Sequence, residues 1–262
     1  MNKQKILYAL AGLLAGCAIG FFFANSVNLK EIEKLRGEVA RARNNAGTTQ
    51  PQQGAGRSAD GNASGAPGGE MPSEDEIRDL IAKADASRDD ADFQRKVGQG
   101  VYMYALSTGQ PALMPEAVRL LKRAHEADPK NYETTVLLGN SLFALAQVTD
   151  ASKFAEARVY YNKALATKPD DTNVQTLLGM TYFFGQPSDP ERAIREYRKS
   201  LAAEPRQEMA LQSLAAALIA TGAHAEAQKR IEELQAVNPA NAALSNLRAQ
   251  LAQAKNAAKE KD

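Results

Sequence analysis

"LGMTYFFGQPSDPERAIREYRKSLAAEP", residues 178–205, places a glycine, an alanine and a proline at a spacing that recurs along the chain. Gly179 is followed by Tyr182, Ala193 by Tyr197, and Pro205 closes the stretch. The small residues at the glycine and alanine positions allow two neighbouring helices to touch. Proline ends the second helix because it has no backbone N–H and its ring clashes with the preceding turn. The stretch therefore predicts a pair of packed helices.

The same spacing occurs four times in the sequence. In each copy the proline stands twelve positions after an alanine, and a glycine or alanine stands ten positions after each of the first three prolines. The alanine–proline pairs are Ala117 and Pro129, Ala157 and Pro169, Ala193 and Pro205, and Ala227 and Pro239. The interval between successive prolines shortens from forty positions to thirty-six and then to thirty-four. Four copies in phase predict an architecture of repeated helix pairs.

This pattern resembles the tetratricopeptide repeat, in which L-G-x2-Y, A-x3-F and proline recur with a period of about 34 residues. The first copy departs furthest, with Val97-Gly98-x2-Val101, and the tryptophan of the family's first helix is absent throughout. The resemblance implies an all-α solenoid of about four helix-turn-helix repeats. A capping box at Ser73 and Glu76 predicts an extra N-terminal helix. Leucines at helical spacing after Pro239 predict a C-terminal capping helix.

We divide the chain on these signals and on composition. The predicted segments are a cytoplasmic tail (1–5), a transmembrane helix (6–25), a short juxtamembrane helix (26–43), a flexible linker (44–72), an N-terminal helix (73–91), repeats at 92–130, 131–170, 171–206 and 207–240, and a capping helix with a tail (241–262). The linker is rich in Gly, Ala, Pro, Gln, Asn and Ser, so it cannot bury enough apolar surface to fold.

The irregular length of the repeats falls between the first small residue and the alanine. This interval is nineteen, eighteen and fourteen positions in the first three repeats, whereas the fourth has the twelve that the family pattern needs. We therefore expect enlarged turns within three repeats, at 107–115, 147–154 and 185–190, gathered along one edge of the solenoid. The alternative is that turns simply tolerate insertions.

The resemblance also implies a partner-binding groove lined by the first helix of each repeat. Carried onto this chain, the positions around the glycine are Arg95, Gln99, Tyr102, Met103, Val136, Asn140, Phe143, Thr176, Met180, Phe183, Phe184, Gln212 and Ile219. Only Asn140 and Arg95 stand where the family's carboxylate clamp has polar groups, so no clamp is predicted. The groove suits an apolar or amphipathic helix, with Met180, Phe183 and Phe143 at its centre.

The N-terminus admits two kinds of membrane anchor. Residues 6–24 carry no charge and, at helical rise, are about 28 Å long, which is close to the thickness of a bilayer core. The run Leu14-Ala15-Gly16-Cys17 also resembles a lipobox, with Cys17 as the lipidated residue. We favour the uncleaved helix because the apolar run continues beyond Cys17, and lipidation remains the alternative. Small residues at Gly12, Gly16 and Gly20 would allow two such helices to pair into a homodimer.

Composition argues against several function classes. The 262 residues include one cysteine, two histidines and no tryptophan, with a net charge of +1. A single cysteine excludes disulfides within the chain and thiolate metal sites, and the charge gives no reason to expect nucleic acid. His125 and His224 lie about a hundred positions apart with no Ser/Asp arrangement around either, and we expect both to be exposed. We predict no catalytic residue, no metal and no cofactor, and therefore a chain that is not an enzyme.

The layout of anchor, tether and repeats indicates an interaction protein of the bacterial envelope. Lys3 and Lys5 favour a cytoplasmic N-terminus, which places the repeats in the periplasm as part of a single-pass inner-membrane protein. The layout is similar to the periplasmic repeat domains of cytochrome c maturation factors, which implies a protein or peptide partner. The competing hypothesis is a scaffold or lipoprotein subunit that uses the loop edge of the solenoid.

Overall fold

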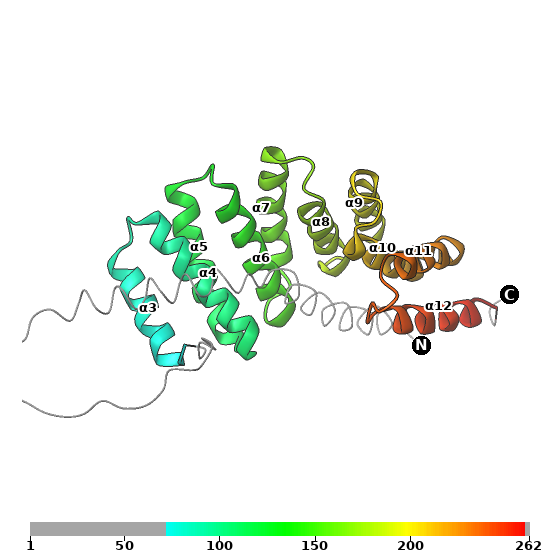
Figure 1. Ribbon diagram of the computed structural model, residues 1–262, viewed down its shortest axis with the longest axis horizontal. Coiled ribbons are helices and arrows are strands. Elements are labelled where there is room, and N and C mark those ends of the chain that lie inside the picture. Colours follow the sequence, from blue (N-terminus) through cyan, green and yellow to red (C-terminus); the bar gives the residue numbers. More distant parts are fainter. Residues whose placement is uncertain (1–71, 260–262) are drawn as a thin grey trace, which may run out of the picture.

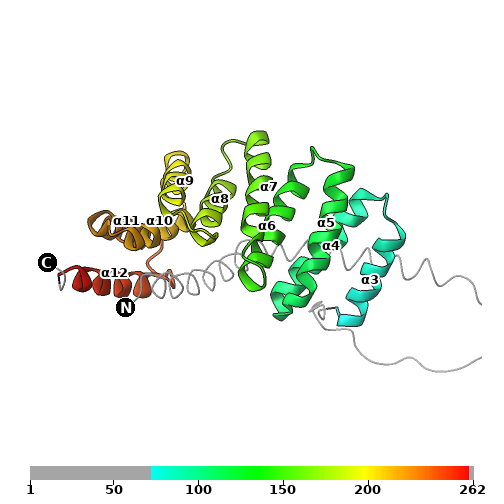
Figure 2. The same ribbon diagram turned by 180° about the vertical axis from the view of Figure 1, so that it is seen from behind.

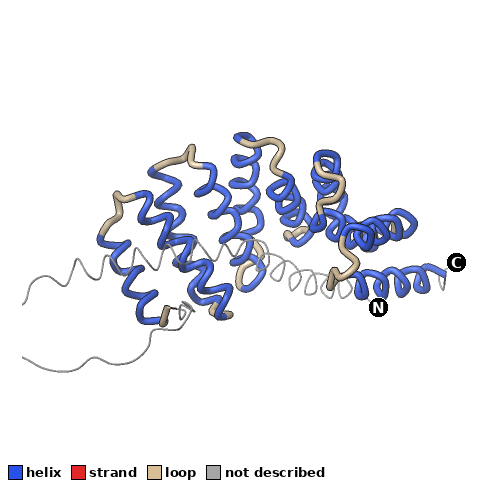
Figure 3. Tube along the Cα trace, viewed as in Figure 1, coloured by secondary structure: helices blue, strands red, loops and turns tan. Residues whose placement is uncertain are grey.

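The computed structural model describes residues 72–259, and within this range the chain forms ten α-helices, one 3-10 turn and no strand (Figure 3). The helices are α3 (Glu74–Ala86), α4 (Ala91–Thr108), α5 (Met114–Ala127), α6 (Tyr132–Val148), α7 (Lys153–Thr167), α8 (Thr172–Phe184), α9 (Pro190–Ala203), α10 (Glu208–Thr221), α11 (His224–Val237) and α12 (Leu244–Lys259). The predicted all-helical class is confirmed for this part of the chain.

The helices pair in sequence order into four hairpins, α4–α5, α6–α7, α8–α9 and α10–α11, each packed against the next. Figure 1 shows α3 and α12 at opposite ends of the stack, and Figure 2 shows the same order from behind. The helix axes turn steadily along the stack. Helices α3 to α7 run across the long axis of the molecule, whereas α12 lies along it. The result is a twisted solenoid in which each hairpin contacts mainly its neighbours.

Close approach within a hairpin depends on the small residues that the sequence pattern contains. A Cβ added at Gly139 would lie 2.7 Å from the Tyr161 ring, and one at Gly179 would lie 2.6 Å from the Tyr197 ring. At Gly98 an added Cβ would lie 2.8 Å from Leu121. The alanines of the second helices are fully buried. They are Ala117, Ala157, Ala193 and Ala227. The repeated motif is thus the contact line between the two helices of each pair.

The connections between hairpins share one capping arrangement. Asn131, Asp171 and Gln207 precede α6, α8 and α10, and the side-chain oxygen of each accepts a hydrogen bond from the backbone N–H three residues later. Such caps satisfy amides that have no partner inside the helix. A proline stands two residues before each cap, so the preceding helix cannot continue into the next one.

The extra length of the first two repeats lies only partly in their turns, which corrects the expectation of enlarged loops. Helices α4 and α6 have 18 and 17 residues, whereas α8 and α10 have 13 and 14. About one additional helical turn therefore accommodates roughly half of the insertion in each. Between α8 and α9 the prediction holds, since α8 is short and residues 185–189 form the turn.

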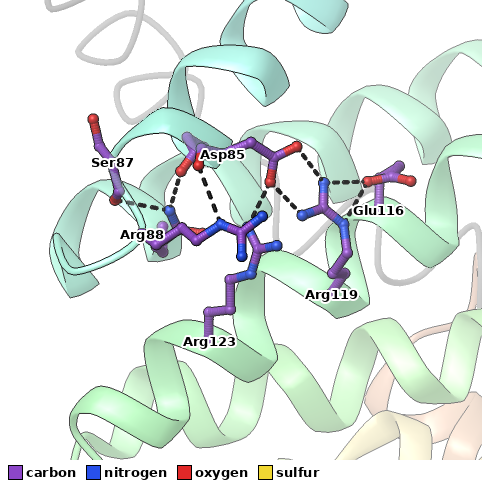
Figure 4. A network of polar contacts seen from close by, with 8 residues as sticks. Asp85, Ser87, Arg88, Glu116, Arg119 and Arg123 are labelled. Atoms are coloured by element: carbon purple, nitrogen blue, oxygen red, sulfur yellow. Dashed lines mark hydrogen bonds and ion pairs between the residues drawn. The ribbon is translucent and has the colours of Figure 1, made fainter.

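The N-terminal helix α3 has the predicted capping box, with the Ser73 hydroxyl and the Glu76 carboxylate each accepting a backbone N–H. Salt bridges connect the C-terminal end of α3 to the first hairpin, α4–α5. The Asp85 carboxylate binds the guanidinium groups of Arg119 and Arg123 on α5 (Figure 4). These two arginines lower the pKa of Asp85 to about 2.

The buried Gln94 side chain adds a second tie to α3, because its amide nitrogen donates to the carbonyls of Ala84 and Ser87. At the other end of the stack, α12 buries Leu244, Leu247 and Leu251 as their spacing predicts. Both terminal helices thus cover the ends of the solenoid core.

Within residues 72–259 no helix has the length and apolar character needed to cross a membrane. The anchor predictions at residues 6–25, with Gly12, Gly16, Gly20 and Cys17, lie outside the described residues. The same is true of the predicted tail, the juxtamembrane helix and the linker up to residue 71.

Candidate functional site: the first-helix face

Six of the thirteen predicted groove residues are buried in the core, and the prediction that they face a partner is wrong for this conformation. They are Tyr102, Phe143, Thr176, Met180, Phe183 and Ile219. The correction includes the three residues chosen as the centre of the groove. Met180, Phe183 and Phe143 are 2%, 3% and 2% exposed. A partner segment docked on this protein cannot contact side chains that other residues of the same chain already cover.

Aromatic packing between the second and third repeats explains much of this burial. The rings of Phe143 on α6 and Phe154 on α7 are 5.2 Å apart, and Phe154 stacks on Phe184 of α8 at 6.1 Å. Phe183 meets Phe184 edge to face at 5.2 Å. Such ring pairs contribute about 0.5–1.5 kcal/mol each beyond area burial. The four phenylalanines therefore form a seam that joins two repeats.

Thr176 and Tyr102 have different surroundings. The Thr176 hydroxyl donates to the Thr172 carbonyl and lies 2.9 Å from the Ser200 hydroxyl on α9, so it faces its own second helix. Burial raises the pKa of the Tyr102 phenol well above its usual range. Both side chains belong to the packing of the repeats.

Seven predicted residues remain partly accessible, and five of them come from the first two repeats. Arg95, Gln99 and Met103 lie on α4, and Val136 and Asn140 lie on α6. We call these five residues the first-helix face. The other two, Phe184 and Gln212, lie on α8 and α10.

Side-chain contacts show that α4 and α6 present this face together. The Arg95 guanidinium lies 3.6 Å from the carboxylate of Glu133 on α6 and 2.9 Å from that of Asp92 on its own helix. The same guanidinium donates to the Gln99 amide oxygen at 3.5 Å. The Tyr161 hydroxyl donates to the Asn140 amide oxygen at 3.0 Å, which leaves the Asn140 amide N–H₂ free to donate. The face thus offers polar groups in fixed positions beside Met103 and Val136.

Charge is distributed unequally between the two kinds of helix. Within their described ranges, α6 carries Glu133 as its only charged residue, α10 carries only Glu208, and α8 carries none. The second helices α5, α7, α9 and α11 carry four to six charged residues each. The first helix α4 is the exception, with Asp92, Arg95 and Lys96. Low charge on α6, α8 and α10 favours contact with apolar or neutral surfaces, whereas the second helices suit solvent and charged partners.

His125 is buried, which corrects the expectation that it is exposed. Its Nδ1 atom lies 3.2 Å from the Thr135 hydroxyl of α6, and its Nε2 atom lies 3.3 Å from the Lys163 ammonium of α7. The ring also meets Tyr160 edge to face at 5.2 Å. Burial, and then the Lys163 charge, hold the His125 pKa below 6.5. His125 is therefore a packing residue between the first two repeats. His224 begins α11 and is half-buried.

Sequence reasoning also missed a pair of arginines around one tyrosine ring. Arg158 of α7 and Arg192 of α9 both lie over Tyr182 of α8. No pattern within a single repeat indicates this arrangement, since its members come from two repeats. In the part of the chain that the structure describes, no group of three or more His, Cys, Asp or Glu side chains is placed to hold a metal ion.

Comparison with known proteins agrees with the helical-repeat architecture. Residues 186–251 match the family model described as "Tetratricopeptide repeat". This match covers α9, α10, α11 and part of α12. None of the curated proteins searched matches the sequence.

Several solved structures share the fold. "Crystal structure of MamA" is 21% identical with a TM-score of 0.51, and the match covers 63% of this chain and 87% of that chain. "MamA 41-end from Desulfovibrio magneticus RS-1" is 17% identical with a TM-score of 0.52, covering 63% and 85%. "MamA RS-1 ArsTM double mutant" is 15% identical with a TM-score of 0.53, covering 81% and 97%.

At these identities the likeness concerns the fold alone. Together with the family match and the four helix hairpins, it confirms the resemblance drawn from the sequence. Residues 186–251 thus match the tetratricopeptide repeat, and the described part of the chain has the fold of a tetratricopeptide-repeat solenoid.

Proposed function

We propose that this protein is an interaction module that holds an amphipathic segment of a partner protein against the first-helix face. One observation supports the proposal above the others. Five of the seven predicted groove residues that remain accessible gather on two consecutive first helices, where Arg95 of α4 contacts Glu133 of α6. Met103 and Val136 provide apolar contact, while Gln99 and Asn140 provide hydrogen-bonding groups. This mixture suits a helix with one apolar and one polar side.

Site-specific photocrosslinking in the native host tests this proposal. A photoreactive residue at Val136 or Gln99 is expected to form an adduct with one protein, which mass spectrometry identifies. The matched control is the same residue at Val159 on α7, which is 51% exposed. An adduct that forms equally well from Val159, or only from Val159, would show that the partner docks on the second helices.

We also propose that the module is held at the bacterial inner membrane by residues 6–25, with the repeats in the periplasm. The uncharged run at these residues supports this anchor. The module would then act in assembly or maturation of an envelope protein, with cytochrome c biogenesis as one such pathway. The alternatives are a lipoprotein anchored at Cys17 and a scaffold that uses the loop edge.

Replacement of Cys17 separates the two anchors. Cys17→Ser is expected to leave the protein at full length, in the membrane fraction and without incorporated palmitate. Loss of membrane attachment in this variant, or palmitate label on the parent chain that the variant lacks, would establish the lipoprotein instead.

A further inference from the structure

Two arginines from consecutive repeats converge on one aromatic ring. The guanidinium carbon Cζ of Arg158 on α7 lies 4.8 Å from the centre of the Tyr182 ring, and that of Arg192 on α9 lies 4.3 Å from it. Tyr182 lies on α8, and α8 packs against both α7 and α9 (Figure 1). The Tyr182 side chain is buried, so the two guanidinium groups form part of its cover.

These guanidinium groups have no acidic counterpart. Among residues 72–259, no carboxylate lies within ion-pair distance of either one, although Arg119 on α5, Arg198 on α9 and Arg230 on α11 each have such a partner. The nearby Asp189 accepts a hydrogen bond from the backbone N–H of Arg192 and caps α9. Two positive charges are thus held close together with no carboxylate paired to them.

Among the described residues, no acceptor is hydrogen-bonded to the Nη atoms of Arg158 or to the guanidinium of Arg192. The two Cζ atoms can be no further apart than the sum of their distances to the ring centre, which is about 9 Å. A guanidinium stacked on a ring keeps its N–H groups in a plane that suits carboxylates. The Nε atom of Arg158 donates to the Phe154 carbonyl at 3.3 Å, so this side chain is held in place before any ligand arrives. Because the two guanidinium groups are at most about 9 Å apart, neighbouring acidic side chains of one segment can reach both of them.

We propose that Arg158, Tyr182 and Arg192 form a binding site for the carboxylates of an acidic segment in a partner protein. Arg195 extends the site, because it is exposed, lies three residues beyond Arg192 on the same helix face, and has no carboxylate partner in the described structure. Three arginines without a carboxylate partner in the described structure suit a run of Asp or Glu better than one compact anion. The arginines of this site come from the second helices α7 and α9, and none of its residues belongs to the first-helix face.

Fluorescence anisotropy with labelled hexaglutamate and the full-length chain tests this site. Hexaglutamate is expected to bind, hexaglutamine is not, and Arg158→Gln/Arg192→Gln is expected to weaken binding at least tenfold. Arg198→Gln is the matched control, since Arg198 lies on α9 but already pairs with Glu226, and it is expected to change binding less than twofold. Arg158→Lys/Arg192→Lys keeps the charge but loses the planar stacked donors, so an intermediate affinity is expected.

Thermal melts followed by circular dichroism show whether each variant is folded. If Arg158→Gln/Arg192→Gln does not fold, the affinity of Arg158→Lys/Arg192→Lys is compared with that of the parent instead. The proposal is overturned if hexaglutamate does not bind, or if a folded Arg158→Gln/Arg192→Gln variant binds it as well as the parent. If Arg198→Gln weakens binding equally, hexaglutamate responds to the net charge of the protein and not to this site, which also overturns the proposal. Full competition by inorganic phosphate at equal concentration would assign the site to compact anions and also overturn it.

Discussion

The Gly139→Ala substitution measures how closely the two helices of a repeat approach. The new Cβ would lie 2.7 Å from Cε1 and 2.9 Å from Cδ1 of Tyr161, both shorter than real Cβ contacts. The Tyr161 ring cannot easily move away, because it is fully buried and its hydroxyl donates to Asn140. Gly100→Ala is the matched control, since an added Cβ there meets no atom within 4 Å and the residue lies inside α4.

Two effects of known size compete at these positions. Alanine in a helix interior is more stable than glycine by about 1 kcal/mol, so Gly100→Ala is expected to stabilise the protein by roughly 0.5–1 kcal/mol. Gly139→Ala has the same backbone gain, but overpacking costs about 1–3 kcal/mol. The rigid ring places this cost at the upper end. We therefore expect a net loss of about 1–2 kcal/mol and a difference of about 2–3 kcal/mol between the variants.

Urea unfolding of both variants, followed by circular dichroism, gives this difference directly. Thermal melts should agree, because 1 kcal/mol shifts the melting temperature by about 2–4 °C in a domain of this size. Tyr161→Leu removes the ring that clashes with the new Cβ. Adding Gly139→Ala to Tyr161→Leu should therefore cost less stability than adding Gly139→Ala to the parent protein. If Gly139→Ala proves as stable as Gly100→Ala, the helices are not in the close contact described here and the reasoning fails.

Further predictions concern the core and two titrating groups. Phe183→Ala is expected to lower the free energy of unfolding by about 3–5 kcal/mol in urea, and a change below about 1 kcal/mol would contradict its place in the aromatic seam. Because Arg119 and Arg123 hold the folded-state pKa of Asp85 at about 2, below 3.8, its stabilising contribution is present above about pH 4 and is lost as pH falls towards 2. Asp85→Asn should therefore destabilise the protein at pH 7 and have little effect at pH 2, with the largest loss of helix protection from hydrogen exchange in α3. His125 has a folded-state pKa below 6.5, so the unfolded chain takes up the proton first and stability falls as pH drops below about 6.5. His125→Gln should flatten the pH dependence of urea unfolding between pH 7 and pH 5, and an unchanged slope would show that His125 does not cause it.

The pattern within each repeat was sufficient to predict the helix pairs. Gly179, Ala193 and Pro205 define a contact line and a helix end, and each acts on neighbours within its own repeat. The capping box at Ser73 and the leucines of α12 could be predicted from the sequence because they too act on neighbours close in the chain. Local signals of this kind depend on helical periodicity and capping, which hold wherever the segment packs.

The sequence could not predict which first-helix residues of the candidate site stay accessible. Val136 and Thr176 occupy equivalent places before the glycine of their repeats, yet Val136 is half-buried and Thr176 is buried. Met180 and Asn140 differ likewise. Exposure of a first-helix residue depends on the size of the side chains in the adjacent repeat and on the twist between repeats, and neither is encoded in the repeat's own motif.

The sequence by itself thus determined the class of fold and the line along which paired helices touch, because these follow from small residues, prolines and periodicity over short distances. The tertiary structure decided the rest. It divided the insertions between longer helices and turns, buried His125 against Lys163, and brought Arg158 and Arg192 from two different repeats to one ring. These outcomes depend on packing between repeats, where contacts form between residues whose spacing in the chain follows no motif.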